Sequence, residues 1–356
     1  MLRQAINELS IELELRTESP LLVKEGRLTD DVRNSIAPTD QKRQQYLPHA
    51  IPVSRSPDRA MRGAIRESVD QRNILAGANA VSKLAFYIPG TSLRGPWRAY
   101  LERNLRSLDP PAAPRVCDPF AGEVGRVDRS CSKTLEKLVD KRLAYARSCP
   151  VCRLFGSTAQ AGRLGISDAE LAPGSDPKIE IRDMVAIKRS TGSVENKFQF
   201  FALGGAGFTG KIRLRNFELV QVRLLAELIE AIPKIPIGSG KGKGFGRLSF
   251  AESSVDIRLT QFGADRPDDR FRGIAEHPVW GPDLCRDYEL TPHGELARLD
   301  GDGWEETAPW RFERNIEYAQ FKQLASQVPL NWGVVRQLAE RLLGQEDADG
   351  KDVRQP

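Results

Sequence analysis

This 356-residue chain contains segments with the alternating pattern of a β-strand and segments with the spacing of an amphipathic helix. The order of these segments limits the fold more than any other feature. Residues 9–15 (LSIELEL) alternate apolar and polar side chains, which is the period of a half-buried strand. After a Pro-Gly turn, an amphipathic segment predicts a helix that begins near Ser92, and 220–235 also has helical spacing. Further strand patterns lie at 162–171, 179–203, 211–219 and 247–250. The order strand, helix, strand, strand, helix, strand is the split βαβ arrangement, so we predict an α+β protein.

The segment 24–83 breaks this pattern. It is polar and rich in arginine, and only 60–72 has the spacing of a short helix. Long stretches without periodicity are typically functional loops. We therefore predict a long functional or mobile loop between the first strand and the first helix.

An exposed β-hairpin is predicted within 179–203. Two strand-like runs there flank a polar turn, and Thr191, Gly192 and Ser193 lie near the expected tip. The helix predicted near Ser92 would offer its free N–H groups to an anion, with Arg94 and Arg98 beside it. A plain helix start is the alternative interpretation.

A glycine run, IGSGKGKGFGRLSF, begins at Ile237 and interleaves glycines with Lys241 and Lys243. Closely spaced glycines let backbone N–H groups approach a phosphate, and the two lysines supply positive charge. The run is not a Walker A loop, because Arg247 leads into a strand and no Gly-Lys-Ser/Thr opens a helix. A glycine-rich turn without a ligand is the alternative, and the interleaved lysines favour phosphate binding.

Four of the five cysteines cluster with the spacing C-x13-C-x17-C-x2-C, at Cys117, Cys131, Cys149 and Cys152, while Cys285 stands apart. In a reducing compartment a C-x2-C pair is more often a metal clip or a redox pair than a disulfide. Four thiolates satisfy a tetrahedral zinc ion without an open position, so the predicted zinc site is structural. Four unrelated buried thiols are the alternative.

The charge of the chain is unevenly distributed. Residues 1–260 carry 41 Lys and Arg against 29 Asp and Glu, whereas residues 261–356 carry 12 against 19. A basic body suits a polyanion and an acidic segment suits a protein partner or masks the basic surface, although a solvated charged surface explains both. No run of about 18 apolar residues is present and the first residues lack a signal-peptide pattern, so we expect a cytoplasmic protein without a membrane segment.

Four stretches, in this order, carry a family resemblance: FYIPGTSLRG, CPVCRLFGS, RDMVAIKRSTG and IGSGKGKGFGRLSF. They resemble the RAMP (repeat-associated mysterious protein) superfamily, specifically the backbone subunits that polymerise along CRISPR RNA in type III effectors. The matches span roughly 9–250 and are most similar to subunits with a zinc insert, as in type III-D and fused single-chain effectors. The resemblance implies a ferredoxin-like (RRM-like) RNA-binding domain over 1–260, with a zinc insert at about 105–160.

The resemblance also implies the residues that bind RNA. Ser92 and Arg94 would contact phosphates of the guide RNA. The hairpin, about 181–201, would be the thumb that wedges into the guide–target duplex, with Lys188 and Arg189 on the RNA backbone. The glycine loop, 237–247, would lie along the guide through Gly240, Lys241, Gly242, Lys243, Gly244 and Arg247. Such contacts position RNA without reading its sequence. The implied partners are CRISPR RNA, complementary target RNA and other effector subunits, including neighbouring backbone subunits.

Active members of the family cleave target RNA with an Asp five residues before an Arg, in the loop after the first strand. Counting back from Arg55 gives Ala50, next to His49, so the Asp is absent and we expect the subunit to hold RNA without cutting it. One alternative is that His49 acts as a general acid or base in RNA cleavage. If the alignment shifts, Asp31 or Asp40 is the catalytic carboxylate and acts with a divalent metal. Two other classes stay open: a CRISPR RNA-processing endoribonuclease, and a zinc-containing protein-interaction scaffold.

Residues 261–356 lie outside the resemblance. This acidic extension contains four of the five tryptophans: Trp280, Trp304, Trp310 and Trp332. Aromatic enrichment suggests a docking surface for a neighbouring subunit, and ordinary packing on the core is the alternative. The extension ends in a helical pattern, VVRQLAERLLGQ, followed by a charged end.

Overall fold

The computed structural model describes residues 4–25, 28–36, 38–108, 116–118, 130–135, 138, 140–293, 297–301 and 303–328, without the side chains of 38–41 and 141. The chain combines α-helices with an antiparallel sheet, which confirms the predicted α+β class. None of the helices described is long and apolar enough to cross a membrane.

The strands are β1 (Asn7–Thr17), β2 (Tyr87–Ile88), β3 (Gly156–Ser157), β4 (Gln160–Ala161), β5 (Leu164–Ile166), β6 (Ala169–Leu171), β7 (Lys178–Ile187), β8 (Val194–Gly204), β9 (Gly207–Arg215), β10 (Leu248–Ser249), β11 (Asp256–Phe262), β12 (Glu305–Ala308) and β13 (Arg311–Ile316). The α-helices are α1 (Leu28–Asn34), α2 (Asp58–Asp70), α3 (Ile74–Val81), α4 (Gly90–Ser107), α5 (Cys131–Leu135), α6 (Lys141–Ala146), α7 (Pro150–Phe155), α8 (Leu219–Glu230), α9 (Gly281–Tyr288) and α10 (Tyr318–Gln327). The 3-10 helices are η1 (Pro38–Tyr46), η2 (Ile232–Lys234), η3 (Lys241–Lys243) and η4 (Glu252–Ser254).

In the main sheet, the strands β11, β1, β9 and β5 lie side by side in this order, and each is antiparallel to the next. Along the chain these strands follow the predicted order, because α4 lies between β1 and β5, and α8 lies between β9 and β11. The last strand differs from the prediction. The predicted segment 247–250 pairs only briefly with β1 as β10, and the longer pairing belongs to β11, which the sequence pattern did not indicate.

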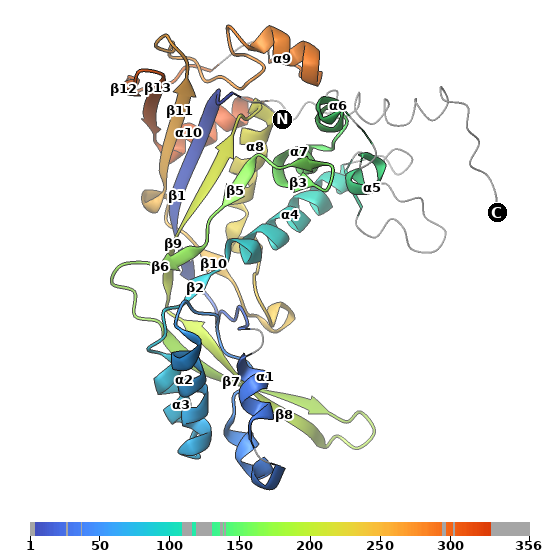
Figure 1. Cartoon of the computed structure of the whole chain (residues 1–356), viewed down its shortest axis with the longest axis vertical. Coiled ribbons are helices and arrows are strands. Elements are labelled where there is room, and N and C mark those ends of the chain that lie inside the picture. Colours follow the sequence, from blue (N-terminus) through green and yellow to red (C-terminus); the bar gives the residue numbers. More distant parts are fainter. Residues whose placement is uncertain are drawn as a thin grey trace, which may run out of the picture.

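The core lies under one face of this sheet. Leu9, Ile11, Leu13 and Leu15 alternate along β1 and are buried, because successive side chains of a strand point to opposite faces. The helices α4 and α8 pack on that face, and Trp97 of α4 is among the largest fully buried side chains. In Figure 1 the sheet and these helices form the upper part of the molecule.

The prediction of a long loop over 24–83 is wrong, because α1, η1, α2 and α3 occupy much of it. The short helix expected at 60–72 is present as α2. Its buried positions, Met61, Ala64, Ile65, Ser68 and Val69, lie three or four residues apart, which is the spacing of one helix face. These helices and the hairpin form the lower part of Figure 1.

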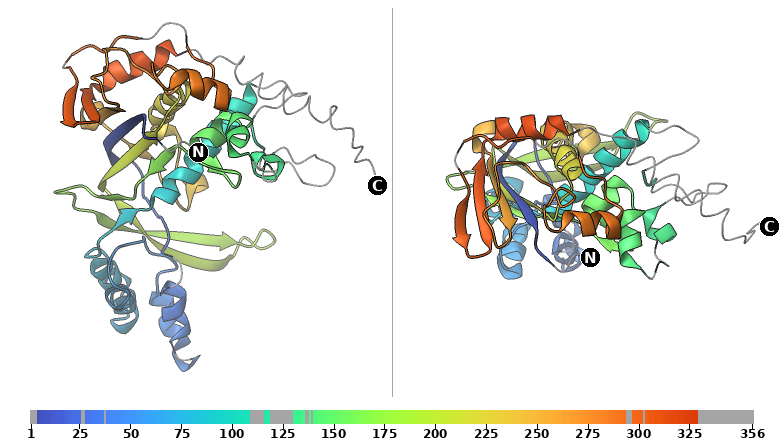
Figure 2. Two further views of the ribbon diagram at one scale, coloured as in Figure 1. Left: turned by 45° about the horizontal axis from the view of Figure 1, so that its top comes forward. Right: turned by 90° about the horizontal axis from the view of Figure 1, so that it is seen from above.

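The strands β7 and β8 pair with each other as a separate two-stranded sheet, from Lys178 opposite Gly204 to Ile187 opposite Val194. Residues 188–193 connect them, with Thr191, Gly192 and Ser193 at the turn. The outer half of the hairpin is exposed, and Figure 2 shows it projecting from the body of the protein.

The C-terminal extension continues the main sheet, because β13 pairs with β11 and β12 pairs with β13. The predicted domain boundary at 260/261 therefore lies inside β11. Trp304 is buried, whereas Trp280 is 40% and Trp310 is 62% exposed. Trp332 and the terminal helical pattern lie outside the described residues.

Candidate metal centre and nucleic-acid surface

The four clustered cysteines meet in one buried site. Their Sγ atoms all lie within 4.8 Å of one another, with 3.6 Å between Cys117 and Cys152 and 3.8 Å between Cys117 and Cys149. All four are free thiols. A tetrahedral zinc ion with Zn–S bonds of about 2.3 Å places its sulfurs about 3.8 Å apart. The cluster therefore has the donor set and the spacing that a zinc ion needs, and four buried cysteines so close together can hold a metal.

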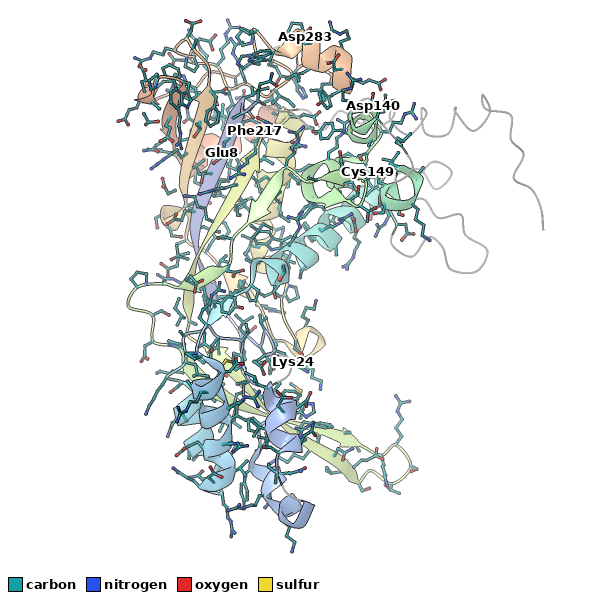
Figure 3. The ribbon with its side chains drawn as sticks, in the orientation of Figure 1. Glu8, Lys24, Asp140, Cys149, Phe217 and Asp283 are labelled. Carbon is teal, nitrogen blue, oxygen red and sulfur yellow. The ribbon has the colours of Figure 1, made fainter. Side chains whose placement is uncertain are left out.

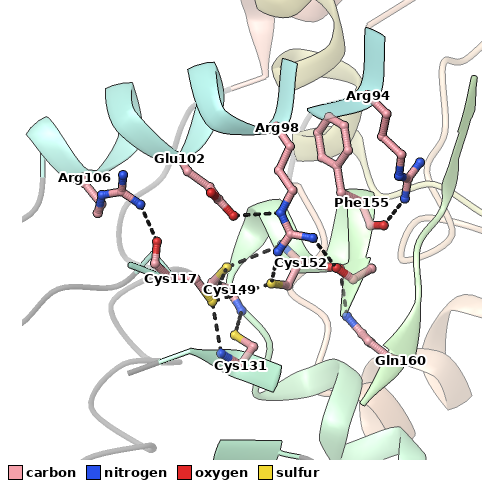
Figure 4. A network of polar contacts seen from close by, with 11 residues as sticks. Arg94, Arg98, Glu102, Arg106, Cys117, Cys131, Cys149, Cys152, Phe155 and Gln160 are labelled. Atoms are coloured by element: carbon pink, nitrogen blue, oxygen red, sulfur yellow. Dashed lines mark hydrogen bonds and ion pairs between the residues drawn. The ribbon is translucent and has the colours of Figure 1, made fainter. Parts of the chain in front are cut away.

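Short local structures hold the sulfurs in place (Figure 4). Cys149 caps α7 and its Sγ accepts a hydrogen bond from the Cys152 N–H, while the Sγ of Cys131, which opens α5, accepts from the Cys149 N–H. The Cys131 N–H in turn donates to the Cys117 Sγ at 3.0 Å. Hydrogen bonds among the thiols, led by those with Cys117, lower the pKa of Cys149 well below its usual value and raise that of Cys131 well above it.

The helix α4 supplies the fourth N–H donor. Arg98 Nη2 lies 3.2 Å from the Cys152 Sγ, and the same guanidinium donates to Glu102 at 2.8 Å and to the Gly156 carbonyl at 2.9 Å. Arg106, two turns further along α4, donates to the Cys117 carbonyl. Each sulfur thus accepts one N–H, and hydrogen bonds of this kind orient the ligands of a metal ion.

The sequence predicted that the N-terminus of α4 binds an anion. In the structure the carboxylate of Asp168 occupies this position. The Gly90 N–H donates to Asp168 Oδ1 at 2.7 Å, and Arg55 pairs with Asp168 from the other side. These two partners hold the pKa of Asp168 below its usual value. Nothing in the sequence indicated Asp168, which reaches α4 from 78 positions further along the chain.

The two arginines predicted beside this helix start face inward. Arg94 donates to the Leu164 carbonyl at 2.9 Å and to the Phe155 carbonyl, so a phosphate would have to compete with both. Burial, with the neighbouring Arg98, lowers the pKa of Arg94. Ser92 is partly exposed in the first turn of α4, with its N–H bonded to the Pro89 carbonyl.

The glycine loop packs against the segment that follows β1. The Ser239 N–H donates to the Leu22 carbonyl at 2.7 Å, and the Gly246 N–H donates to the Pro20 carbonyl at 2.9 Å. Between these anchors the single 3-10 turn η3 presents Lys241 and Lys243 to solvent. The loop is therefore fixed at both ends and exposed in its middle.

One face of the hairpin base meets this loop and the segment around His49. Lys243 Nζ lies 3.0 Å from Met184 Sδ of β7, and buried Phe245 belongs to an apolar cluster with Leu22 and Ala50. Figure 3 marks Lys24 at this junction, where its Nζ lies 5.3 Å from the centre of the Phe200 ring. Segments that are far apart in sequence thus form one continuous surface, which we call the glycine-loop surface.

The exposed cations of this surface are Lys24, Lys241, Lys243 and Arg247, and none of them forms an ion pair with a carboxylate of the described chain. Lys188 and Arg189 are also exposed, but they lie at the far tip of the hairpin. The sequence predicted five of these six cations. It missed Lys24, which only the packing of the hairpin brings to the loop.

Three catalytic candidates came from the sequence, and His49 is the one that contacts the hairpin. His49 is half-buried, and its ring contacts Phe198 and Phe200 at 4.8 and 5.2 Å between ring centres. Burial lowers its pKa, and the nearby cations Arg33 and Lys24 lower it further, so the folded protein favours the neutral form of His49.

The other candidates lie on α1 and η1. The exposed carboxylate of Asp31 pairs with Arg62 at 3.0 Å. Asp40 falls within η1, and its side chain lies outside the described part. Ala50, at the position expected for the family's Asp, is buried, and its carbonyl accepts the Phe201 N–H at 3.0 Å.

Comparison with known proteins identifies the family. A search of curated proteins finds no match to this chain. The family model of the RAMP superfamily matches residues 14–249, which include the end of β1, the cysteine cluster, the hairpin and the glycine loop. Because this match covers more than half of the sequence, the chain belongs to the RAMP superfamily.

Proposed function

We propose that this chain is a backbone subunit of a type III CRISPR effector, which binds the guide RNA and holds it together with a complementary target RNA. Membership of the RAMP superfamily is consistent with CRISPR-associated RNA binding. The observation that carries the proposal is the glycine-loop surface, where a fixed loop with two free lysines adjoins the base of a projecting hairpin.

The chemistry of this surface suits a phosphate backbone. Lys241 and Lys243 are exposed and form no ion pair within the described chain, and Gly242 between them adds no side chain. Cations that are not neutralised by the protein gain most when a polyanion binds and releases its counterions. Contacts of this kind position RNA, while base pairing with the guide reads the target.

The architecture supports the finer assignment of the fold. The order β11, β1, β9, β5 with two helices on one face is that expected of a ferredoxin-like, RRM-like domain. The projecting hairpin has the form of a thumb, with Lys188 and Arg189 exposed at its tip. The exposed Trp310 and Trp280 of the extension are suited to contact other effector subunits.

We also assign a structural zinc ion to the cysteine cluster. The four sulfurs fit its tetrahedral geometry and leave no position open, so the ion would stabilise the fold and take no part in a reaction. Cys117, Cys131, Cys149 and Cys152 would hold it, and Arg98 and Arg106 tie this centre to α4.

The subunit binds RNA without cutting it in this proposal. Ala50 occupies the expected position of the carboxylate, and its buried carbonyl is engaged by the hairpin. Asp31 is already paired with Arg62, and the ring of His49 contacts two phenylalanine rings. Cleavage then belongs to another subunit of the complex, and the chain acts in antiviral defence as a cytoplasmic ribonucleoprotein component.

The test is a salt titration of single-stranded RNA binding to the full chain. Replacing Lys241 and Lys243 by alanine should weaken binding about equally for all sequences and flatten the slope of log K against log salt by about 1.4, which is 0.7 for each lost phosphate contact. The matched control replaces Arg270 and Arg298, two exposed arginines of the extension, by alanine. Equal losses in both double variants, or no loss in the first, would contradict the proposal.

A further inference from the structure

A basic pocket lies on the open face of the main sheet, away from the glycine-loop surface. It has a volume of about 660 Å³ and is bounded by β5 with its preceding residues and by the end of β9. Lys211, Arg213 and Arg215 alternate along β9 and line it, because their neighbours Ile212 and Leu214 point into the core. Pockets of this size commonly accept small-molecule ligands.

The cations in this pocket are only partly neutralised by the protein. On the neighbouring strand β1, Glu8 pairs with Arg215 at 3.1 Å, and Glu12 approaches Lys211 at 3.9 Å. Figure 3 labels Glu8 on this face. Arg213 lies opposite Ser10, which carries no charge, and forms no ion pair within the described chain. Exposed pairs such as Lys211 with Glu12 contribute little energy, so an incoming anion can displace them.

A second arginine in the pocket wall is buried and lacks acceptors. Arg163 is 6% exposed, and its Nε and Nη2 have no hydrogen-bond partner among the described residues. Its guanidinium packs 4.6 Å from the ring centre of Tyr145. The buried carboxylate of Glu218 is paired with Arg153 at 3.0 Å. A buried guanidinium with unsatisfied donors favours an anionic ligand.

Glycine keeps the pocket open at its centre. Gly165 of β5 lies directly opposite Arg213, so a side chain there would share the face of Arg213. A Cβ at Gly165 would lie 3.8 Å from the nearest backbone oxygen, which is an ordinary contact. The sheet therefore tolerates a larger residue at this position, and glycine leaves space beside the arginine.

We propose that this pocket binds a phosphate group, carried either by a free nucleotide or by an RNA strand. Planar guanidinium groups form paired hydrogen bonds with phosphate oxygens, and Arg213 and Arg163 are the two arginines of the pocket that no carboxylate of the described residues engages. Lys211 adds charge at the rim.

The site is separate from the surface of the proposed function. The hairpin joins β9 at Gly207, which lies four residues along the strand from Lys211 and six from Arg213, distances of about 14 and 20 Å at about 3.4 Å per residue. Phosphate binding in the pocket therefore does not depend on guide binding at the glycine loop. The two proposals fail independently, because the double variant of Lys241 and Lys243 should leave the pocket intact.

The test titrates inorganic phosphate, adenosine 5′-monophosphate and a short single-stranded RNA into the full chain by calorimetry. Arg213→Ala should weaken phosphate binding about tenfold or more, the effect of losing a charge-assisted hydrogen bond. Gly165→Leu should weaken it as much without removing any charge. The control, Arg258→Gln, removes an exposed arginine from the same face outside the pocket and should leave binding unchanged.

The outcomes separate the two sources of the phosphate. If Arg213→Ala weakens binding of the mononucleotide, the ligand of the pocket is a free nucleotide. If the wild-type chain does not bind the mononucleotide and Arg213→Ala weakens RNA binding, the ligand is an RNA strand. The proposal would be overturned if the chain bound neither phosphate nor nucleotide and bound RNA independently of Arg213. Equal losses of binding in Arg258→Gln and Arg213→Ala would also overturn it. Circular dichroism checks the fold of each variant, and the exposed Arg213→Ala keeps the test decisive if Gly165→Leu does not fold.

Discussion

Alanine substitutions in the glycine loop separate glycines that the fold requires from glycines that leave room for RNA. Gly246 has a φ of +81°, and a Cβ there would lie 1.9 Å from the Ile237 carbonyl oxygen. Gly244 has a φ of +84° with nothing within 4 Å of its Cβ position, and Gly242 has neither constraint. An alanine therefore meets no constraint at Gly242, a strained backbone at Gly244, and both a strained backbone and a steric clash at Gly246.

The magnitudes follow from these geometries. A left-handed backbone costs an alanine about 1–2 kcal/mol, which is the whole expected loss for Gly244→Ala. Gly246→Ala adds the displacement of the Ile237 backbone, whose N–H donates to the Gly246 carbonyl at 2.9 Å, and losing that hydrogen bond costs about 1–3 kcal/mol more. Gly242→Ala should change the free energy of unfolding by less than about 1 kcal/mol, in either direction.

Urea unfolding of the three variants at pH 7 measures these free energies, and RNA titration measures function. Gly242→Val should unfold with nearly wild-type stability yet bind RNA several-fold more weakly, because its side chain fills the space between Lys241 and Lys243. Equal destabilisation by Gly242→Ala and Gly246→Ala would refute the assignment of structural roles. Unchanged RNA affinity in Gly242→Val would refute the need for open space.

Three further predictions concern the metal centre, the helix cap and cleavage. Cys149→Ser should lower bound zinc from about one equivalent to under half by metal analysis, while Cys285→Ser retains it; intact zinc in the first variant contradicts the site. Asp168→Asn should cost about 0.5–1 kcal/mol at pH 7, since the side chain is 39% exposed. The pKa of Asp168 is lowered by folding, so its stabilisation is present above about pH 4 and lost as the pH falls, and a gap in urea unfolding that does not narrow as the pH falls below about 4 contradicts this. In an assembled complex with matched target RNA, no cut should map to this hairpin; a cut abolished by Asp31→Ala or Asp40→Ala shows that this subunit cleaves.

Local patterns predicted the elements whose periodicity is strong. The alternation of 9–15 and the helical spacing of 220–235 correspond to β1 and α8, and the turn at Thr191 connects β7 and β8. Each of these patterns is a property of neighbouring residues, so it is present before the chain folds. Within 24–83 only α2 was predicted; α1 and α3, with 7 and 8 residues, are too short for their spacing to stand out in the sequence.

The sites divide in the same way. The C-x2-C spacing indicated a metal clip, yet only the fold shows that Cys117 and Cys131 reach the same point as Cys149 and Cys152. The arginines expected to bind phosphate near Ser92 turn inward, because α4 packs on β5 and on the cysteine cluster and offers them carbonyl acceptors there.

The sequence by itself determined the α+β class, the hairpin, the glycine loop and the identity of the clustered thiols, since these depend on spacing along the chain. Only the tertiary structure decided that Asp168 caps α4, that Lys24 joins the glycine-loop surface, and that Arg163 and Arg213 share a pocket. Such partners lie tens of residues or more apart, and strand pairing and helix packing bring them together. Their contacts depend on the topology of the whole sheet, which local periodicity does not specify.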